Sequence, residues 1–263
     1  MIPHVMGIVN VTPDSFSDGG AHLRTADAVA HGLRLADEGA AVIDVGGEST
    51  RPGAAPVELA TELARVVPVI EGLRSALGDR HRLSVDTRKA EVARAAVAAG
   101  ASLINDVSGE LYEVAADLGV GWVAMHMQGE PGTMQRDPRY DDVVSEVCDW
   151  LDQRAARAEA CGVGEVWIDP GIGFGKTAAH NWALLAHLDR FVATGRPVLV
   201  GASRKQFLGV ALAASDGVPA PTAVDDRREA SVAVATWAMH AGARMIRAHD
   251  VRMTVHAARV VAA

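Results

Sequence analysis

Polar and charged side chains follow short β-branched segments along the whole chain, at positions where they could bind a small polar ligand. They are carboxylates, amides, imidazoles and cations in turn: Asn10, Asp44 with Glu48, Asp86, Asn105 with Asp106, His126, Asp169, Ser203 with Lys205, and Arg247 with His249. Solvation of loops explains one or two such residues, but loops are more often rich in glycine, serine, lysine and glutamate. Together these groups can accept hydrogen bonds from N–H donors and can neutralise an anion. They include no convincing nucleophile–base pair.

Several loops have compositions that suit an anion. Residues 46–53 combine glycines, hydroxyls and one arginine, although a flexible surface turn fits this composition equally well. Residues 201–205 and 247–250 each lead from a strand into a helix, a common place for anion contacts. Residues 169–177 contain Gly-Lys-Thr, but Pro170 stands where a phosphate-binding loop requires glycine, so we do not expect an NTPase.

The segments that must position these residues alternate between two hydrophobic patterns, that of a buried strand and that of an amphipathic helix. Eight apolar strand segments are each followed by a helical pattern, without a Pro/Gly/Ser-rich linker or a shift in composition. Helices are expected over 57–77, where Pro68 should kink or divide the helix, and over 139–161. Strands that are apolar on both faces are typical of a parallel sheet covered by helices. An open doubly wound sheet would alternate in the same way, but eight even units favour a closed barrel.

We therefore predict an α/β fold, a (β/α)8 TIM barrel forming a single domain over residues 1–263. In such a barrel the polar strand ends converge on one mouth, where the active sites of this fold lie. The length agrees with this, because one α/β barrel commonly takes about 250 residues.

Charge and hydropathy exclude other classes of protein. The net charge of −8 argues against a general nucleic-acid surface. No apolar stretch is long enough to span a bilayer, and the first residues do not form a signal peptide. We therefore expect a cytoplasmic protein with neither nucleic-acid nor membrane partners. Cys148 and Cys161 are expected to be buried free thiols.

The motifs resemble, in order and from end to end, those of bacterial dihydropteroate synthases. The matching segments are residues 10–20, 46–53, 84–87, 104–109, 125–127, 169–177, 203–205 and 247–250. The resemblance implies a transferase of folate biosynthesis. Such an enzyme condenses (7,8-dihydropterin-6-yl)methyl diphosphate with p-aminobenzoate to give 7,8-dihydropteroate and diphosphate.

The resemblance implies a pterin pocket inside the barrel, formed by Asp86, Asn105, Asp169 and Lys205. A pterin presents a guanidine-like edge of N–H donors, which a buried carboxylate can accept. In the plain alternative, Asp86 and Asp169 only cap backbone N–H groups at the strand ends.

The resemblance also implies sites for the diphosphate, a metal and p-aminobenzoate. The diphosphate site would contain Thr50, Arg51, Arg247 and His249, and Asn10 would contribute to a Mg²⁺ site. One protein oxygen is sufficient there, because Mg²⁺ often takes its other ligands from water and phosphate. Near the p-aminobenzoate ring we expect Pro52, Phe174 and Lys205, with Phe16 and Asp18 closing over it. The residues expected to act in catalysis are Asp86, Asp169, Lys205, Phe16 and Asp18.

Two alternatives stay open. A pterin-binding methyltransferase of the same barrel superfamily would share the pterin residues but does not need the diphosphate set. An inactive pterin-binding paralogue should have lost loop residues that this chain retains. The contact to the p-aminobenzoate carboxylate is also open, because Gln206 stands where many relatives carry serine. The resemblance suggests a homodimer.

Overall fold

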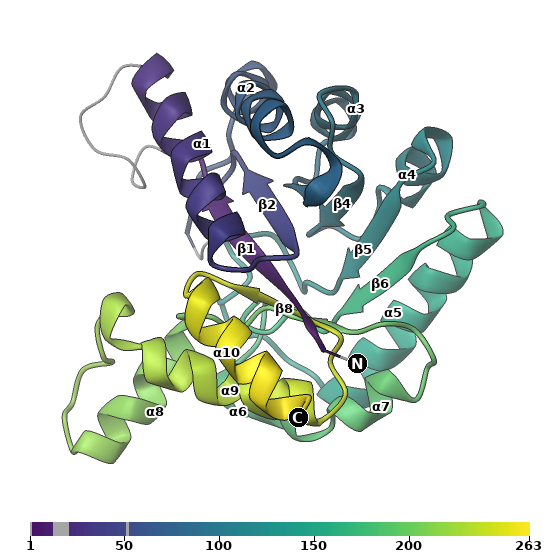
Figure 1. The fold of residues 1–263 in the computed structure, drawn as a ribbon. Coiled ribbons are helices and arrows are strands. Elements are labelled where there is room, and N and C mark those ends of the chain that lie inside the picture. The colour runs from purple at the N-terminus through teal and green to yellow at the C-terminus, as the bar shows by residue number, and fades with distance from the viewer. Residues whose placement is uncertain (1, 13–20, 51–52) are drawn as a thin grey trace.

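Eight parallel strands form a closed ring surrounded by helices (Figure 1). The computed structural model describes residues 2–12, 21–50 and 53–263. The strands are hydrogen-bonded in the order β6-β5-β4-β3-β2-β1-β8-β7. An isolated bridge between Ile168 and Val198 joins the two ends of this order, and Ile168 N donates to Pro197 O at 3.1 Å. The single-domain TIM barrel predicted from the sequence is confirmed.

Each strand is followed by at least one helix. The strands are β1 (His4–Asn10), β2 (Val42–Gly46), β3 (Arg82–Asp86), β4 (Leu103–Asp106), β5 (Gly121–Met125), β6 (Val166–Asp169), β7 (Leu199–Val200) and β8 (Met245–Ala248). The helices are α1 (Ala21–Asp37), α2 (Leu59–Leu77), α3 (Ala90–Ala98), α4 (Tyr112–Leu118), α5 (Val143–Ala160), α6 (Ala178–Ala186), α7 (Leu188–Val192), α8 (Gln206–Asp216), α9 (Arg228–His240) and α10 (Val251–Val261). Short 3₁₀ turns cover Gly78–Arg80 and Val224–Asp226.

Two helices differ from their predicted form. Helix α2 runs through Pro68 as one segment, because its buried face, which includes Val69 and Leu73, packs it on the barrel. Helix α5 begins at Val143 because the Asp142 carboxylate accepts hydrogen bonds from the N–H groups of the first turn. It ends at Ala160, so Cys161 is exposed and the prediction that this thiol is buried was wrong.

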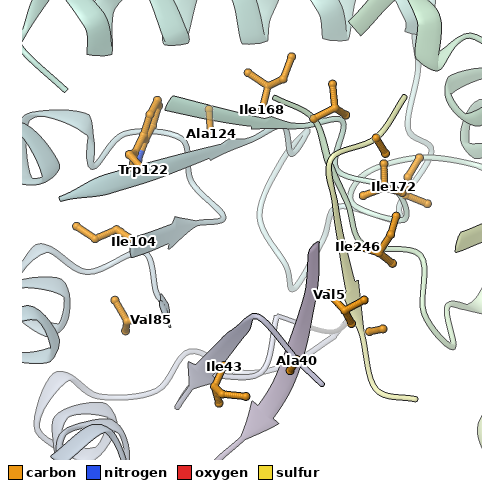
Figure 2. Close-up of a cluster of buried hydrophobic side chains, with 14 of the residues drawn as sticks. Val5, Ala40, Ile43, Val85, Ile104, Trp122, Ala124, Ile168, Ile172 and Ile246 are labelled. Carbon is orange, nitrogen blue, oxygen red and sulfur yellow. The ribbon is translucent and has the colours of Figure 1, made fainter. Parts of the chain in front are cut away.

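Side chains alternate between the two faces of every strand, and this alternation creates two apolar layers. The larger cluster lies between the strands and the helices, and Figure 2 shows Val5, Ile43, Ile104, Trp122 and Ile168 among its members. The smaller cluster fills the interior of the ring with Met6, Val42, Leu103, Val123, Trp167, Leu199 and Met245. The interior is therefore a packed core and not a channel.

Inward-facing positions change from apolar to polar toward the carboxyl ends of the strands. Four polar residues each lie two positions after a member of the smaller cluster on the same strand: Asp44, Asn105, Asp169 and Arg247. Since the side-chain period of a strand is two, these residues point into the same space above the inner core. The fold thus places the polar groups over an apolar floor at the mouth of the barrel, where burial strengthens their electrostatic interactions.

Candidate active site

Arg247 connects three strands at the mouth of the barrel. Its Nε donates to Asp44 Oδ2 at 2.7 Å, and its Nη2 donates to Asp86 Oδ2 at 2.7 Å. Asn105 Nδ2 donates to the same oxygen of Asp44 at 3.0 Å. The side chains from β2, β3, β4 and β8 therefore form one hydrogen-bonded cluster.

The carboxyl group of Asp86 lies at the centre of this cluster. Burial raises the pKa of Asp86 to about 7, although the Arg247 guanidinium opposes the rise. The neighbouring carboxylates of Asp44 and Glu62 add to it. A ligand that donates N–H groups to Asp86 would favour its ionised form and would lower this pKa.

Asp169 supplies a second carboxyl group, at the end of β6. It is almost fully buried, and its Oδ1 accepts a hydrogen bond from Gly171 N at 2.7 Å. Burial raises the pKa of Asp169, whereas the cations of Lys205 and Arg247 lower it. The fixed orientation of Oδ1 directs Oδ2 to the opposite side of the carboxylate.

Two glycines leave space beside these carboxylates. A Cβ atom at Gly46 would lie 3.6 Å from Asp86 Oδ2, and a Cβ atom at Gly201 would lie 3.8 Å from Asp169 Oδ2. The Cβ at Gly201 would also lie 3.7 Å from Arg247 Cβ. A side chain at either position would compete with a ligand for the carboxylate, so both glycines suit a planar group bound between the strand ends.

Lys205 extends the cluster toward the loop after β6. Its ammonium group donates to the carbonyl of Ile172 and lies 4.2 Å from the centroid of the Phe174 ring. Burial lowers the pKa of Lys205 to about 7, and the negative charge of Asp169 opposes this. Phe174 and Lys205 therefore form one wall of the site.

His249 lies beside Ser203, on the same side of the barrel as Arg247. Ser203 Oγ and His249 Nδ1 are 3.0 Å apart, and His249 N donates to Ser203 Oγ at 3.2 Å. The adjacent Arg204 does not join the pocket, because it pairs with Asp250 at 2.7 Å. The three residues of this motif therefore have different roles: Ser203 orients His249, Arg204 pairs with Asp250, and Lys205 lies in the cluster at the barrel mouth.

The site geometry agrees with the similarity of the chain to known proteins. Residues 6–249 match the family described as pterin binding enzyme. The dihydropteroate synthase of Mycobacterium leprae is 48% identical over 267 residues, covering 98% of this chain and 92% of the relative. The chain belongs to the dihydropteroate synthase family.

Solved structures of this family share the fold. The structure of Xanthomonas albilineans dihydropteroate synthase with 4-aminobenzoic acid has a TM-score of 0.89 and 50% identity, covering 98% of this chain and 91% of that one. The same enzyme in complex with 7,8-dihydropteroate has a TM-score of 0.85 and 47% identity, covering 98% and 92%. These relatives give no support to the alternative of a methyltransferase.

The described part of the chain contains most of the expected site residues. Five of the expected residues lie close together: Asp86, Asn105, Asp169, Lys205 and Arg247. Arg247, which was expected in the diphosphate site, contacts Asp44 and Asp86 and so lies among the residues expected to bind the pterin. Thr50 is half-buried in the loop after β2. Phe16, Asp18, Arg51 and Pro52 lie outside the described residues.

Glu48 anchors the loop that carries Thr50. One carboxylate oxygen of Glu48 accepts a hydrogen bond from Val57 N at 2.9 Å, and the other accepts one from Lys89 Nζ at 2.9 Å. Lys89 also pairs with the buried carboxylate of Glu62. The polar group that the sequence places after β2 therefore holds the loop in position, while Asp44 reaches the pocket.

Lys176 and His126 form a buried pair that sequence reasoning did not find. Lys176 Nζ lies 2.9 Å from His126 Nδ1 and donates to Phe174 O at 3.0 Å. Burial lowers the pKa of Lys176 well below its usual value and that of His126 to about 3. The inward orientation of Lys176 agrees with the rejection of a phosphate-binding loop.

We predict that Gly173→Ala impairs substrate binding by displacing Lys205. Gly173 has φ +83°, and a Cβ atom there would lie 2.9 Å from Lys205 Cδ. Pterin affinity should fall about tenfold, since about 1.4 kcal/mol of misplaced contact corresponds to that factor. The measurement is titration calorimetry with the pterin substrate.

The matched control is Gly195→Ala, because Gly195 has nearly the same φ, +81°, and nothing within 4 Å of its added Cβ. Both variants carry the backbone strain of a left-handed alanine. Equal pterin affinity in the two variants would contradict the role given to Lys205.

Proposed function

We propose that this pocket carries out the family reaction with the residues that converge at the barrel mouth. The chain condenses (7,8-dihydropterin-6-yl)methyl diphosphate with p-aminobenzoate to give 7,8-dihydropteroate and diphosphate, as a transferase of folate biosynthesis. The observation that carries the residue assignment is the pair of buried carboxyl groups, Asp86 and Asp169, each beside a glycine at a strand end.

The pterin ring is held between Asp86 and Asp169. Its N–H edge donates to the carboxylates, while Asn105 and Lys205 serve its acceptor atoms. Because a buried carboxylate without a donor is costly, a ligand that presents N–H groups at these positions gains affinity and specificity. Burial raises the pKa of both aspartates, and the N–H donors of a bound pterin would favour their ionised forms.

The diphosphate is bound on the side of Arg247 and His249, with Thr50 and Arg51 from the loop after β2. Phe174 and Lys205 line the approach of p-aminobenzoate, and the family resemblance assigns Pro52, Phe16 and Asp18, which lie outside the described residues, to the same substrate. The aromatic face of Phe174 below the Lys205 ammonium supports this division of the site.

The chemistry needs charge stabilisation more than proton abstraction. The amine of p-aminobenzoate is neutral at pH 7, so its lone pair can attack the exocyclic methylene without a base. The carbon–oxygen bond to diphosphate breaks, and negative charge gathers on the leaving group, where Arg247 and His249 stabilise it. Asp86 and Asp169 compensate the positive character that develops on the pterin.

A Mg²⁺ ion fits the donor set at the end of β1. Asn10 is half-buried, and its register partner Gly46 is also the partner of Asp86, so the three residues share one edge. Its amide oxygen is a ligand type that Mg²⁺ accepts alongside water and phosphate. When bound there, Mg²⁺ would neutralise charge on the diphosphate.

We expect purified protein to form dihydropteroate only when Mg²⁺ is present. Asn10→Ala should raise the Mg²⁺ concentration needed for half-maximal rate without changing the unfolding temperature. The assay follows dihydropteroate by chromatography over a Mg²⁺ titration. Full activity in excess EDTA would exclude the metal role, and the absence of product at every Mg²⁺ concentration would favour the inactive paralogue.

We also propose a homodimer in the cytoplasm. Trp182, Val210 and Trp237 are exposed on α6, α8 and α9. These helices are neighbours, because Trp182 contacts Phe207 with ring centroids 4.8 Å apart and Trp237 Nε1 donates to Leu185 O at 3.0 Å. A monomer mass in light scattering would contradict the dimer.

Among the described helices none could cross a membrane.

A further inference from the structure

Asp44 is fully buried and makes contacts that the family reaction does not explain. Its Oδ2 accepts hydrogen bonds from both Arg247 Nε and Asn105 Nδ2. Its Oδ1 is also buried and has no hydrogen-bond partner among the described residues. A buried oxygen without a partner costs stability, so the carboxylate at this position is better explained by function than by folding.

The two sides of the Arg247 guanidinium have different partners. Nε faces Asp44, which lies deeper in the barrel, whereas Nη2 faces Asp86 at the strand end. Asp86 is also the acceptor that the proposed function assigns to the pterin. A pterin N–H donor and Nη2 of Arg247 therefore compete for the same carboxylate.

We propose that Asp44 is a positioning residue that holds Arg247 through Nε while the Nη groups transfer from Asp86 to the diphosphate when the substrate binds. This inference rests on the proposed function. The planar guanidinium can turn as a whole about its Nε–H···Oδ2 hydrogen bond through rotation of the side-chain torsions, which moves the Nη groups while the bond to Asp44 is kept. The same oxygen of Asp44 also orients Asn105, so a single carboxylate aligns a pterin-binding residue and a diphosphate-binding residue.

The arrangement makes pterin binding and diphosphate binding interdependent. Pterin occupancy of Asp86 releases the Nη groups, and the released groups then gain a partner only if the ligand carries a diphosphate. Asp44 supplies the negative charge that keeps the guanidinium in place during the exchange. Burial alone would lower the pKa of Arg247, but the negative charges of Asp44 and Asp86 raise it above its usual value.

The variant Asp44→Asn tests the inference because it retains the shape of the side chain. Its amide oxygen can still accept hydrogen bonds from Asn105 and Arg247, but the negative charge that strengthens the bond to Arg247 is lost. Two ligands are titrated by calorimetry: the pterin diphosphate and the corresponding 6-hydroxymethyl pterin without phosphate. The ratio of their affinities measures the contribution of the diphosphate.

We expect Asp44→Asn to reduce this ratio at least tenfold, with the affinity for the hydroxymethyl pterin within about threefold of wild type. The matched control is Ser84→Ala. Ser84 is the register partner of Asp44 on β3, is fully buried, and has an Oγ without a hydrogen-bond partner among the described residues. The control should leave both affinities unchanged.

An unchanged ratio, or an equal loss of affinity for both ligands, would overturn the inference, because Asp44 would then only shape the pocket. If wild-type protein binds neither ligand, the proposed function fails and the inference fails with it.

A measurement on the wild-type protein decides the matter if Asp44→Asn does not fold. The ¹⁵N resonance of Arg247 Nε, assigned by its loss in Arg247→Lys, should show slow proton exchange both without and with the pterin diphosphate. Fast exchange in the bound state would show that Nε leaves Asp44 and would overturn the inference.

Discussion

Replacing Arg247 by alanine is expected to lower kcat/KM by about 10² to 10³-fold, the cost of removing one charged group that stabilises a developing anion. Arg247 is the cation between Asp44 and Asp86, and the proposed reaction also uses it on the departing diphosphate. Its removal leaves two buried carboxyl groups without a cation. The free energy of unfolding should therefore fall as well, by up to about 3–5 kcal/mol, with protonation of Asp86 reducing the loss.

The control for Arg247→Ala is Arg82→Ala, which removes an arginine of similar exposure at the other end of the barrel. Arg82 pairs with both carboxylate oxygens of Glu165, at 2.6 and 2.8 Å, where β3 begins. This variant should lose stability but keep kcat/KM per folded molecule. Steady-state kinetics and chemical denaturation measure the two effects separately, and an equal loss of kcat/KM in both variants would contradict the role of Arg247.

Asp169→Asn should weaken pterin binding about tenfold to a hundredfold, equivalent to about 1–3 kcal/mol from unpaired buried polar groups. The structure fixes the orientation of the side-chain amide that this substitution introduces. Gly171 N–H requires an oxygen at the position of Oδ1, so the new NH2 group must replace Oδ2. It would then face the N–H donors of the pterin. Asp86→Asn should also weaken pterin binding, because it replaces one acceptor oxygen of the carboxylate by an NH2 group.

Titration calorimetry with the pterin diphosphate measures both aspartate variants. The control is Asp106→Asn, at a fully buried carboxylate that accepts hydrogen bonds from Leu111 N and Trp122 Nε1, away from the barrel interior. This variant should lower the unfolding temperature and keep the pterin affinity of the folded protein. Wild-type affinity in Asp169→Asn would mean that the carboxylate only caps the strand end.

The barrel fold, and the end of the barrel at which the site lies, follow from the sequence alone. Both depend on local patterns: eight apolar strands alternate with amphipathic helices, and each strand ends in a polar group such as Asp86 or Asp169. Parallel strands in a closed ring must bring such ends together. The position of Asp44 two residues after Val42 also carried a signal, since that spacing keeps both side chains on the inner face.

Which of these polar groups interact with one another depends on how the strands are arranged in the folded barrel. Arg247 and Asp44 are 203 residues apart and meet because β8 closes the ring beside β1, which brings the end of the chain next to β2. Lys176 is part of a glycine-rich motif, yet it turns inward to His126 because the loops after β5 and β6 pack together. The raised pKa of Asp86 and the lowered pKa of Lys205 arise from burial among neighbouring charges. These contacts and pKa shifts depend on the distances between residues of different strands, so they cannot be predicted from any single segment of the chain.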